Sequence, residues 1–168
     1  DLVDAAGDCK LEKEAARRQM DPWEIARVEE QHFKDDLALM EIPPAHHYPR
    51  ATDHIPQMIE MIEVLLQKEL AYEADGNVYF DITQWPKYGA LSGNRLEELE
   101  AGASGRVDER SDKRHPLDFS LWKKDAKHLM QWDSPWGRGF PGWHIECSAM
   151  ARAYLGNTLD IHTGGPDN

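Results

Sequence analysis

The residues best suited to chemistry lie between positions 132 and 167. Three glycines and two prolines within residues 135–142 predict a loop whose backbone can approach a ligand closely. A helix-prone run over about residues 144–155 follows, and Gly156 is placed to end it. Because a glycine-rich loop that leads into a helix is a ligand-binding geometry, this segment is the first candidate for a site.

A second candidate follows directly. Residues 158–162 alternate in a pattern that predicts a short buried strand, and the loop formers at 163–167 lie past its carboxyl end. Ligands of open α/β sheets bind at that end of the strands. The two stretches together predict one site shared by a helix start and a strand end.

The elements upstream must position this segment. Lys, Glu, Ala and Arg dominate residues 9–18 and predict an exposed helix. Asp21 and Pro22 form the start of a second helix that reaches about residue 40. Prolines make residues 41–50 an extended connector, after which we expect Thr52 to cap a helix that runs to about Leu70.

Strand patterns follow the third helix. Asp75-Gly76 predicts the turn of a hairpin over residues 71–82, with Val78, Phe80 and Ile82 on one face. Residues 117–122 alternate as a half-buried strand does. We also expect a short helix over 92–100, a mobile loop over 102–115, and a compact part over 50–123 in which the third helix packs on the strands.

Composition limits the classes of protein that fit. The 168 residues carry a net charge of −12, which disfavours holding nucleic acid by bulk electrostatics. The apolar runs are far shorter than the ~18 residues of a membrane span, which argues against membrane insertion and secretion. The two cysteines, Cys9 and Cys147, make no disulfide framework, so we expect a cytoplasmic protein.

Several motifs, in one consistent order, resemble the middle of the cysteinyl-tRNA synthetase family. They are Pro49-Arg-Ala-Thr-x-His-Ile55, Tyr88-Gly-x-Leu-Ser92, Asp118-Phe-x-Leu-Trp-Lys123, the run from Ser134 to Met150 that contains Gly-Trp-His-Ile-Glu-Cys, Leu155-Gly156, and Asp160-Ile-His-x-Gly-Gly-x-Asp167. The resemblance covers about residues 20–167.

The resemblance implies an α/β fold class. The chain would be part of a split Rossmann-type catalytic domain of the class I aminoacyl-tRNA synthetases, interrupted by a mixed α+β insertion. Residues 1–45 would be the helical end of the first catalytic half, residues 46–133 the connective insertion, and residues 134–168 the start of the second half, with the cysteine and adenylate loops.

The family's activity and site residues follow by the same matching. These enzymes use ATP with Mg²⁺ to convert cysteine to cysteinyl-adenylate and then charge tRNA(Cys). Matching assigns Trp143 and His144 to the cysteine pocket, Cys147 to a zinc ion that binds the substrate thiolate, and His162, Gly164, Gly165 and Asp167 to the adenylate. No catalytic residue and no protein partner are predicted.

The matching also implies that the chain is a fragment. The family's N-terminal and C-terminal ATP motifs and its further zinc ligands are absent from the 168 residues. Zinc takes roughly three or four protein ligands, so we expect this chain alone neither to hold zinc tightly nor to form the adenylate.

Other interpretations stay open at this point. A related ligase that joins activated cysteine to an amino sugar in mycothiol synthesis shares the same pockets, and a non-catalytic insertion module that binds a partner is a third possibility. Taken without its motif, Cys147 would more often be a small buried hydrophobic residue than a ligand.

Overall fold

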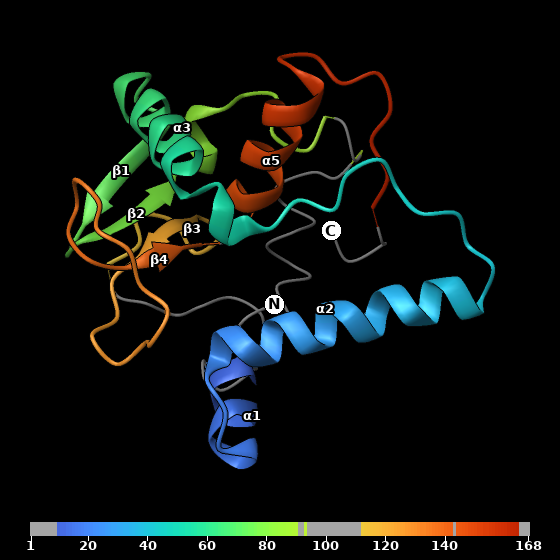
Figure 1. Cartoon of the computed structure of the whole chain (residues 1–168). Helices are drawn as coiled ribbons and strands as arrows, with labels where there is room; N and C mark the ends of the chain where they lie inside the picture. Colours follow the sequence, from blue (N-terminus) through green and yellow to red (C-terminus); the bar gives the residue numbers. More distant parts are fainter. Residues whose placement is uncertain (1–9, 91–92, 94–111, 143, 165–168) are drawn as a thin grey trace. The chain divides into compact units, whose positions relative to one another are not determined.

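The computed structural model in Figure 1 describes residues 10–90, 93, 112–142 and 144–164. The contacts divide the chain into two compact units. One unit contains residues 10–48 and Lys127–Gln131, and the other contains the described residues of 49–126 and 132–164. No helix within the described ranges has the length and apolar character needed to cross a membrane.

The first unit is built on two helices, α1 (Lys10–Arg18) and α2 (Pro22–Leu39). Asp21 is the N-cap residue of α2 and Pro22 follows it, as the sequence predicts, although the Asp21 side chain makes no capping hydrogen bond. Ile25 is buried in this unit. The helices predicted over 9–18 and 21–40 are thus confirmed within the described residues.

Residues 127–131 join this unit through one carboxylate of α1. The backbone N–H of Leu129 donates to Oε1 of Glu12 at 2.6 Å, and Nδ1 of His128 lies 3.3 Å from the same oxygen. His128 is buried. This short segment is therefore held on α1 although it follows the strands of the other unit in sequence.

The second unit contains the remaining elements. In chain order they are η1 (Ala51–Asp53), α3 (Ile55–Gln67), β1 (Ala71–Ala74), β2 (Asn77–Phe80), η2 (Ile82–Gln84), β3 (Phe119–Lys123), β4 (Phe140–Pro141) and α5 (Ile145–Leu155). The strands form one sheet in the order β1-β2-β3-β4, and every neighbouring pair is antiparallel.

The β1–β2 hairpin forms where its turn chemistry predicts. Asp75 and Gly76 have φ values of 50° and 79°. Two successive positive φ values are what a two-residue hairpin turn requires, and Asp and Gly tolerate them well. The hairpin prediction is confirmed, but Ile82 lies in η2 and not on a strand, because the Asp81 side chain accepts the Thr83 N–H at 3.0 Å and starts a 3₁₀ turn.

The core of this unit lies where α3 and α5 meet the sheet (Figure 1). Met58 and Ile62 of α3 are fully buried, together with Val78 and Trp122 of the sheet. Fully burying each such side chain stabilises the fold by about 1.5–3 kcal/mol. The predicted packing of the third helix on the strands is confirmed.

A buried polar cluster centred on Asp118 ties the hairpin to β3. Its carboxylate accepts the Tyr72 hydroxyl at 2.7 Å, the Ile82 N–H at 3.1 Å and the His115 N–H at 3.0 Å. The Arg114 guanidinium lies 4.1 Å from the centroid of the Tyr72 ring. Asp118 is 1% exposed. The three hydrogen bonds that its carboxylate accepts compensate for the cost of removing it from water.

The expected capping of α3 by Thr52 is wrong. Thr52 lies in η1, and the N-cap residue of α3 is His54, whose carbonyl accepts the Met58 N–H at 3.1 Å. Pro56 fixes the first turn of α3, which sets the helix start at Ile55.

The predicted strand over residues 158–162 is also wrong. These residues are exposed and form no strand. A strand needs a neighbour that accepts and donates its backbone hydrogen bonds, and the sheet of the described residues ends at β4 without reaching them. Apart from Gly93, the short helix expected over 92–100 lies outside the described residues, as does most of the loop expected over 102–115.

Candidate functional site

Residues 132–142 form a loop closed by its own hydrogen bonds. The Trp132 N–H donates to the Gly139 carbonyl at 2.7 Å, and the Gly139 N–H returns a bond at 3.0 Å. Inside the loop, the Ser134 hydroxyl donates to the Gly137 carbonyl at 2.6 Å. Gly137 has a φ of 105°, a conformation that residues with side chains rarely adopt.

Two glycines of this loop are required by contact with β3. A Cβ atom on Gly142 would overlap the carbonyl oxygen of Ser120, and one on Gly139 would overlap that of Lys123. The Gly142 N–H donates to the Leu121 carbonyl at 2.8 Å. The close approach that the sequence predicts for a ligand is therefore, at these two positions, an approach to a strand.

The pairing of the loop with β3 places His144 at the start of α5. His144 is the N-cap residue, and its carbonyl accepts the Ser148 N–H at 3.1 Å. Its φ and ψ of 68° and −32° lie in a region that is uncommon for a residue with a side chain. Strained backbone of this kind persists where the surroundings fix it, and it is common at functional sites.

The His144 side chain lies against an aromatic ring of β3. Its ring meets Phe119 edge to face, with centroids 5.2 Å apart and an interplanar angle of 83°. His144 is exposed as a whole residue, yet burial of the imidazole lowers its pKa below the usual 6.5. The imidazole is therefore neutral at pH 7 and can both donate and accept a hydrogen bond.

Cys147 lies in the first turn of α5 and presents an exposed free thiol. This exposure contradicts the interpretation of Cys147 as a small buried hydrophobic residue. The preceding residue, Glu146, is half-buried, and burial raises the pKa of its carboxyl. His144 and Cys147 are thus brought together at one helix start, about one helical turn apart.

The described residues cannot complete a zinc site. No cluster of three or more His, Cys, Asp or Glu side chains with metal-binding geometry occurs among them. Zinc binds thiolate well but takes roughly three or four protein ligands. An exposed thiol fits the role of one such ligand, so Cys147 could contribute to a site whose other ligands come from outside the described residues.

The residues assigned to the adenylate are described only in part. His162 and Gly164 lie in exposed coil beyond α5. Gly165, Asp167 and the cysteine-pocket residue Trp143 lie outside the described residues. The structure therefore brings His144 and Cys147 together but does not place the adenylate residues beside them.

Comparison with known proteins decides the family. A family model described as the tRNA synthetases class I (C) catalytic domain matches residues 4–168. The chain belongs to this family. The mixture of helices and sheet in the described residues agrees with the α/β class that the sequence predicts for such a synthetase domain.

Individual relatives within the synthetase family are similar over nearly the whole chain. The chain is 48% identical to a cysteine–tRNA ligase of Chlorobaculum tepidum over 164 residues, which cover 96% of the chain and 33% of the relative. A Deinococcus radiodurans cysteine–tRNA ligase is 50% identical over 163 residues, covering 96% of the chain and 32% of the relative. The chain spans about one third of the length of these relatives.

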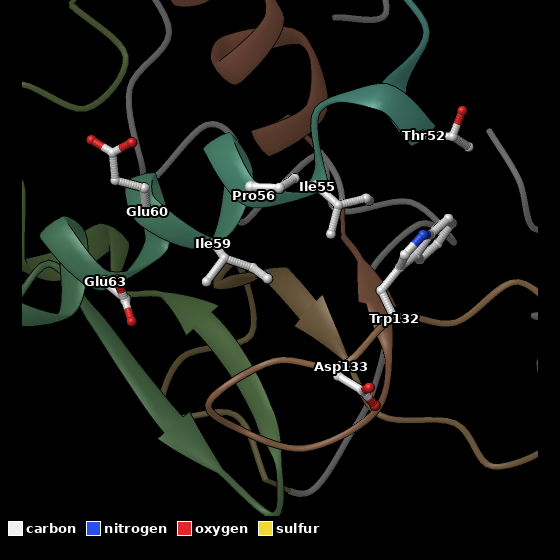
Figure 2. A pocket seen from close by; sticks show the side chains of 8 residues that line it. All are labelled: Thr52, Ile55, Pro56, Ile59, Glu60, Glu63, Trp132 and Asp133. Carbon is white, nitrogen blue, oxygen red and sulfur yellow. The ribbon is translucent and has the colours of Figure 1, made fainter.

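This synthetase segment also has a shallow groove of about 460 Å³ along α3 (Figure 2). Ile55 and Ile59 point from α3 toward Trp132 and Asp133 on the opposite side. Glu63 also lines the groove, and carboxylates on both sides would repel a phosphate. Among the described residues assigned to cysteine or the adenylate, which are His144, His162 and Gly164, none lines the groove.

Reasoning from sequence missed the aromatic residues behind His144. Phe119 contacts His144 and stacks on Phe80, and Tyr88 lies beside both phenylalanines. A signal was present, because Tyr88 and Phe119 belong to quoted synthetase motifs that had no role assigned. Their contact with a site residue could be found only once β2, β3 and α5 were placed.

Proposed function

We propose that the chain is a segment of a cysteine–tRNA ligase, which forms cysteinyl-adenylate from cysteine and ATP and transfers the cysteinyl group to tRNA(Cys). The observation that carries this proposal is the 46–50% identity, over about 96% of the chain, to relatives that bear that name, including one from Thermus thermophilus. The family match over residues 4–168 supports the same activity. Cysteine, ATP with Mg²⁺ and tRNA(Cys) are the proposed substrates, and the proposed compartment is the cytoplasm, where a thiol such as Cys147 stays reduced.

The proposed cysteine pocket lies at the start of α5. His144 and Trp143 would contact the substrate, and the neutral imidazole of His144 would offer it a hydrogen bond without placing a positive charge beside it. Because the ring carries no charge, the cation that attracts the substrate thiolate must be another group. The exposure of His144 supports this arrangement, since a substrate must be able to reach it.

Cys147 is the proposed zinc ligand of this segment. When bound, zinc would supply a borderline-soft cation that binds a thiolate much better than a hydroxyl, which distinguishes cysteine from serine. Packing alone discriminates poorly between groups of similar size. The exposure of the Cys147 thiol supports the assignment.

The proposed adenylate site follows α5. His162, Gly164, Gly165 and Asp167 would hold the nucleotide, with the small residues letting the backbone lie against it and the carboxylate accepting from ribose hydroxyls. The exposure of His162 and Gly164 leaves them accessible to a nucleotide. We keep the predicted division into residues 1–45, 46–133 and 134–168 as part of this proposal.

The activity is tested on a polypeptide that contains this segment within a full-length ligase. We expect cysteine-dependent exchange of pyrophosphate into ATP and charging of tRNA(Cys). Exchange with cysteine that is followed by transfer to an amino sugar and not to tRNA would favour the mycothiol-type ligase. Absence of cysteine-dependent exchange would overturn the proposal.

The 168-residue chain alone serves as the matched comparison. We propose that it shows no exchange above a heat-killed control, because charge that develops on the transferring phosphates needs positioned donors from the family's two ATP motifs. Measurable exchange by the isolated chain would contradict this part of the proposal. A folded, inactive chain that binds a partner would support the non-catalytic insertion module.

A further inference from the structure

We propose that Phe119 is a positioning residue that holds the His144 imidazole at the wall of the cysteine pocket. The inference rests on the proposed function, in which His144 contacts cysteine. Its direct basis is the edge-to-face contact between the two rings, with centroids 5.2 Å apart at 83°. Aromatic pairs in this arrangement attract each other beyond the burial of their surface, so the contact favours one orientation of the imidazole.

Phe119 is itself held in place from behind. Its ring stacks on Phe80 at 5.0 Å with an interplanar angle of 15°, and Tyr88 lies 6.5 Å away on the same cluster. Phe80 and Phe119 are direct partners in the β2–β3 register. Because the sheet backbone fixes both residues, the Phe119 ring offers His144 a rigid surface.

The backbone of His144 needs such support. Its φ of 68° is a strained conformation, and its carbonyl accepts the Ser148 N–H at 3.1 Å. That bond fixes the main chain and leaves the direction of the side chain open. The contact with Phe119 acts on the ring itself and favours one side-chain position of this exposed residue.

The same contact adds to the burial of the imidazole. Burial lowers the pKa of His144, and the Phe119 ring is one apolar surface in contact with the imidazole. A ring that swung into water would regain its ordinary solvation. Phe119 thus favours a position of the imidazole that is partly shielded from water.

The test replaces Phe119 by a residue that fills space without offering a flat ring. In a full-length ligase that contains this segment, Phe119→Leu should raise the KM for cysteine by about tenfold or more, since small misplacements of a contacting group are costly. The KM for ATP should change little. Phe119→Tyr keeps the ring and should restore the KM for cysteine.

Phe33→Leu is the matched control, because Phe33 is an exposed ring in the other unit, 6.4 Å from Tyr48. We expect it to leave both KM values unchanged. Equal changes in the two KM values for Phe119→Leu, or no rescue by Phe119→Tyr, would contradict a positioning role and leave Phe119 as a residue of the fold.

A second measurement keeps the inference testable if Phe119→Leu does not fold. In the unmodified 168-residue chain, NMR should show cross-relaxation between ring protons of Phe119 and His144. Absence of these signals from the folded chain overturns the inference without touching the proposed function. If the signals are present and the full-length protein does not activate cysteine, the proposed function fails and the ring contact stands.

Discussion

Residues 117–122 and residues 158–162 have similar sequence patterns but adopt different structures. Both are predicted to be strands, and both contain a Leu-Asp pair followed by an apolar and then a polar residue, at 117–120 and at 159–162. The first stretch becomes β3, with Leu121 and Trp122 buried between β2 and β4. The second is exposed coil.

Neighbouring strands account for the difference. β3 has a hydrogen-bonding partner on each side, and Asp118 at its start satisfies three donors. Residues 158–162 have no strand beside them among the described residues. Strand propensity therefore acts only where other elements supply the pairing and the burial.

The largest expected loss of stability comes from removing the buried carboxylate at the start of β3. Asp118→Ala leaves the Tyr72 hydroxyl and two backbone N–H groups without their buried acceptor, and should cost about 3–5 kcal/mol of unfolding free energy. Asp160→Ala in the exposed stretch is the matched control and should stay within about 0.5 kcal/mol. Urea unfolding of both variants measures the difference, and similar losses would show that β3 does not depend on this cluster.

A second pair of variants compares burial in the two stretches. Leu121 is 2% exposed and Leu159 is 41% exposed. Leu121→Ala should destabilise the chain by about 2–4 kcal/mol through lost burial and a cavity, whereas Leu159→Ala should have a small effect. The same unfolding assay compares them, and an equal effect would contradict the exposed position of Leu159.

A third variant sharpens the account of β4. Gly142→Ala forces a Cβ atom into the Ser120 carbonyl, so the loop must move away from β3, at a cost of about 1–3 kcal/mol. Gly164→Ala in exposed coil should be nearly neutral for stability. If Gly142→Ala unfolds at the same urea concentration as the parent chain, the close approach of the loop to β3 is wrong.

The smallest expected effect concerns pH. The folded-state pKa of His144 lies below 6.5, so the unfolded chain takes up its proton first as the pH falls below 6.5. Stability contributed by the neutral ring is complete above pH 6.5 and is lost on acidification. Asparagine tolerates the positive φ and does not titrate in this range, so His144→Asn lacks this loss. The difference in melting temperature, variant minus parent, should therefore increase when the pH is lowered from 7 to 5. A constant difference over that range would contradict the lowered pKa.

Much of the fold was predictable from local sequence. Pro22 and Gly156 mark helix ends, Asp75 and Gly76 define the hairpin turn, and the apolar stripe of α3 faces the core. These features depend on the chemistry of a few adjacent residues. The start of α3 at Ile55, with His54 as its N-cap residue, was missed because the position of Pro56 outweighs the capping preference of Thr52.

The candidate site was predictable only through its motif. Cys147 carries no local signal that separates a ligand from a buried thiol, and only its place at the exposed start of α5 removes the second interpretation. The contact of Phe119 with His144 joins β3 to α5 across 25 positions of sequence, which no periodicity can reveal. Long-range contacts of this kind require the fold.

The assignment of Cys147 makes one further prediction for the full-length ligase. Cys147→Ser replaces a thiolate ligand by a neutral hydroxyl, so zinc should be lost and cysteine activation should fall far more than ATP binding. Asp167→Ala should weaken the adenylate and leave the zinc content unchanged, because its carboxylate is assigned to the ribose.

The decisive quantity is the ratio of cysteine-dependent to serine-dependent pyrophosphate exchange in Cys147→Ser, measured with zinc stoichiometry on the same sample. We predict that the ratio falls by about tenfold or more, together with the zinc content, because the cation that distinguishes a thiolate from a hydroxyl is held more weakly. A full equivalent of zinc with unchanged discrimination against serine would contradict the metal assignment and leave Cys147 without a role in recognising the substrate.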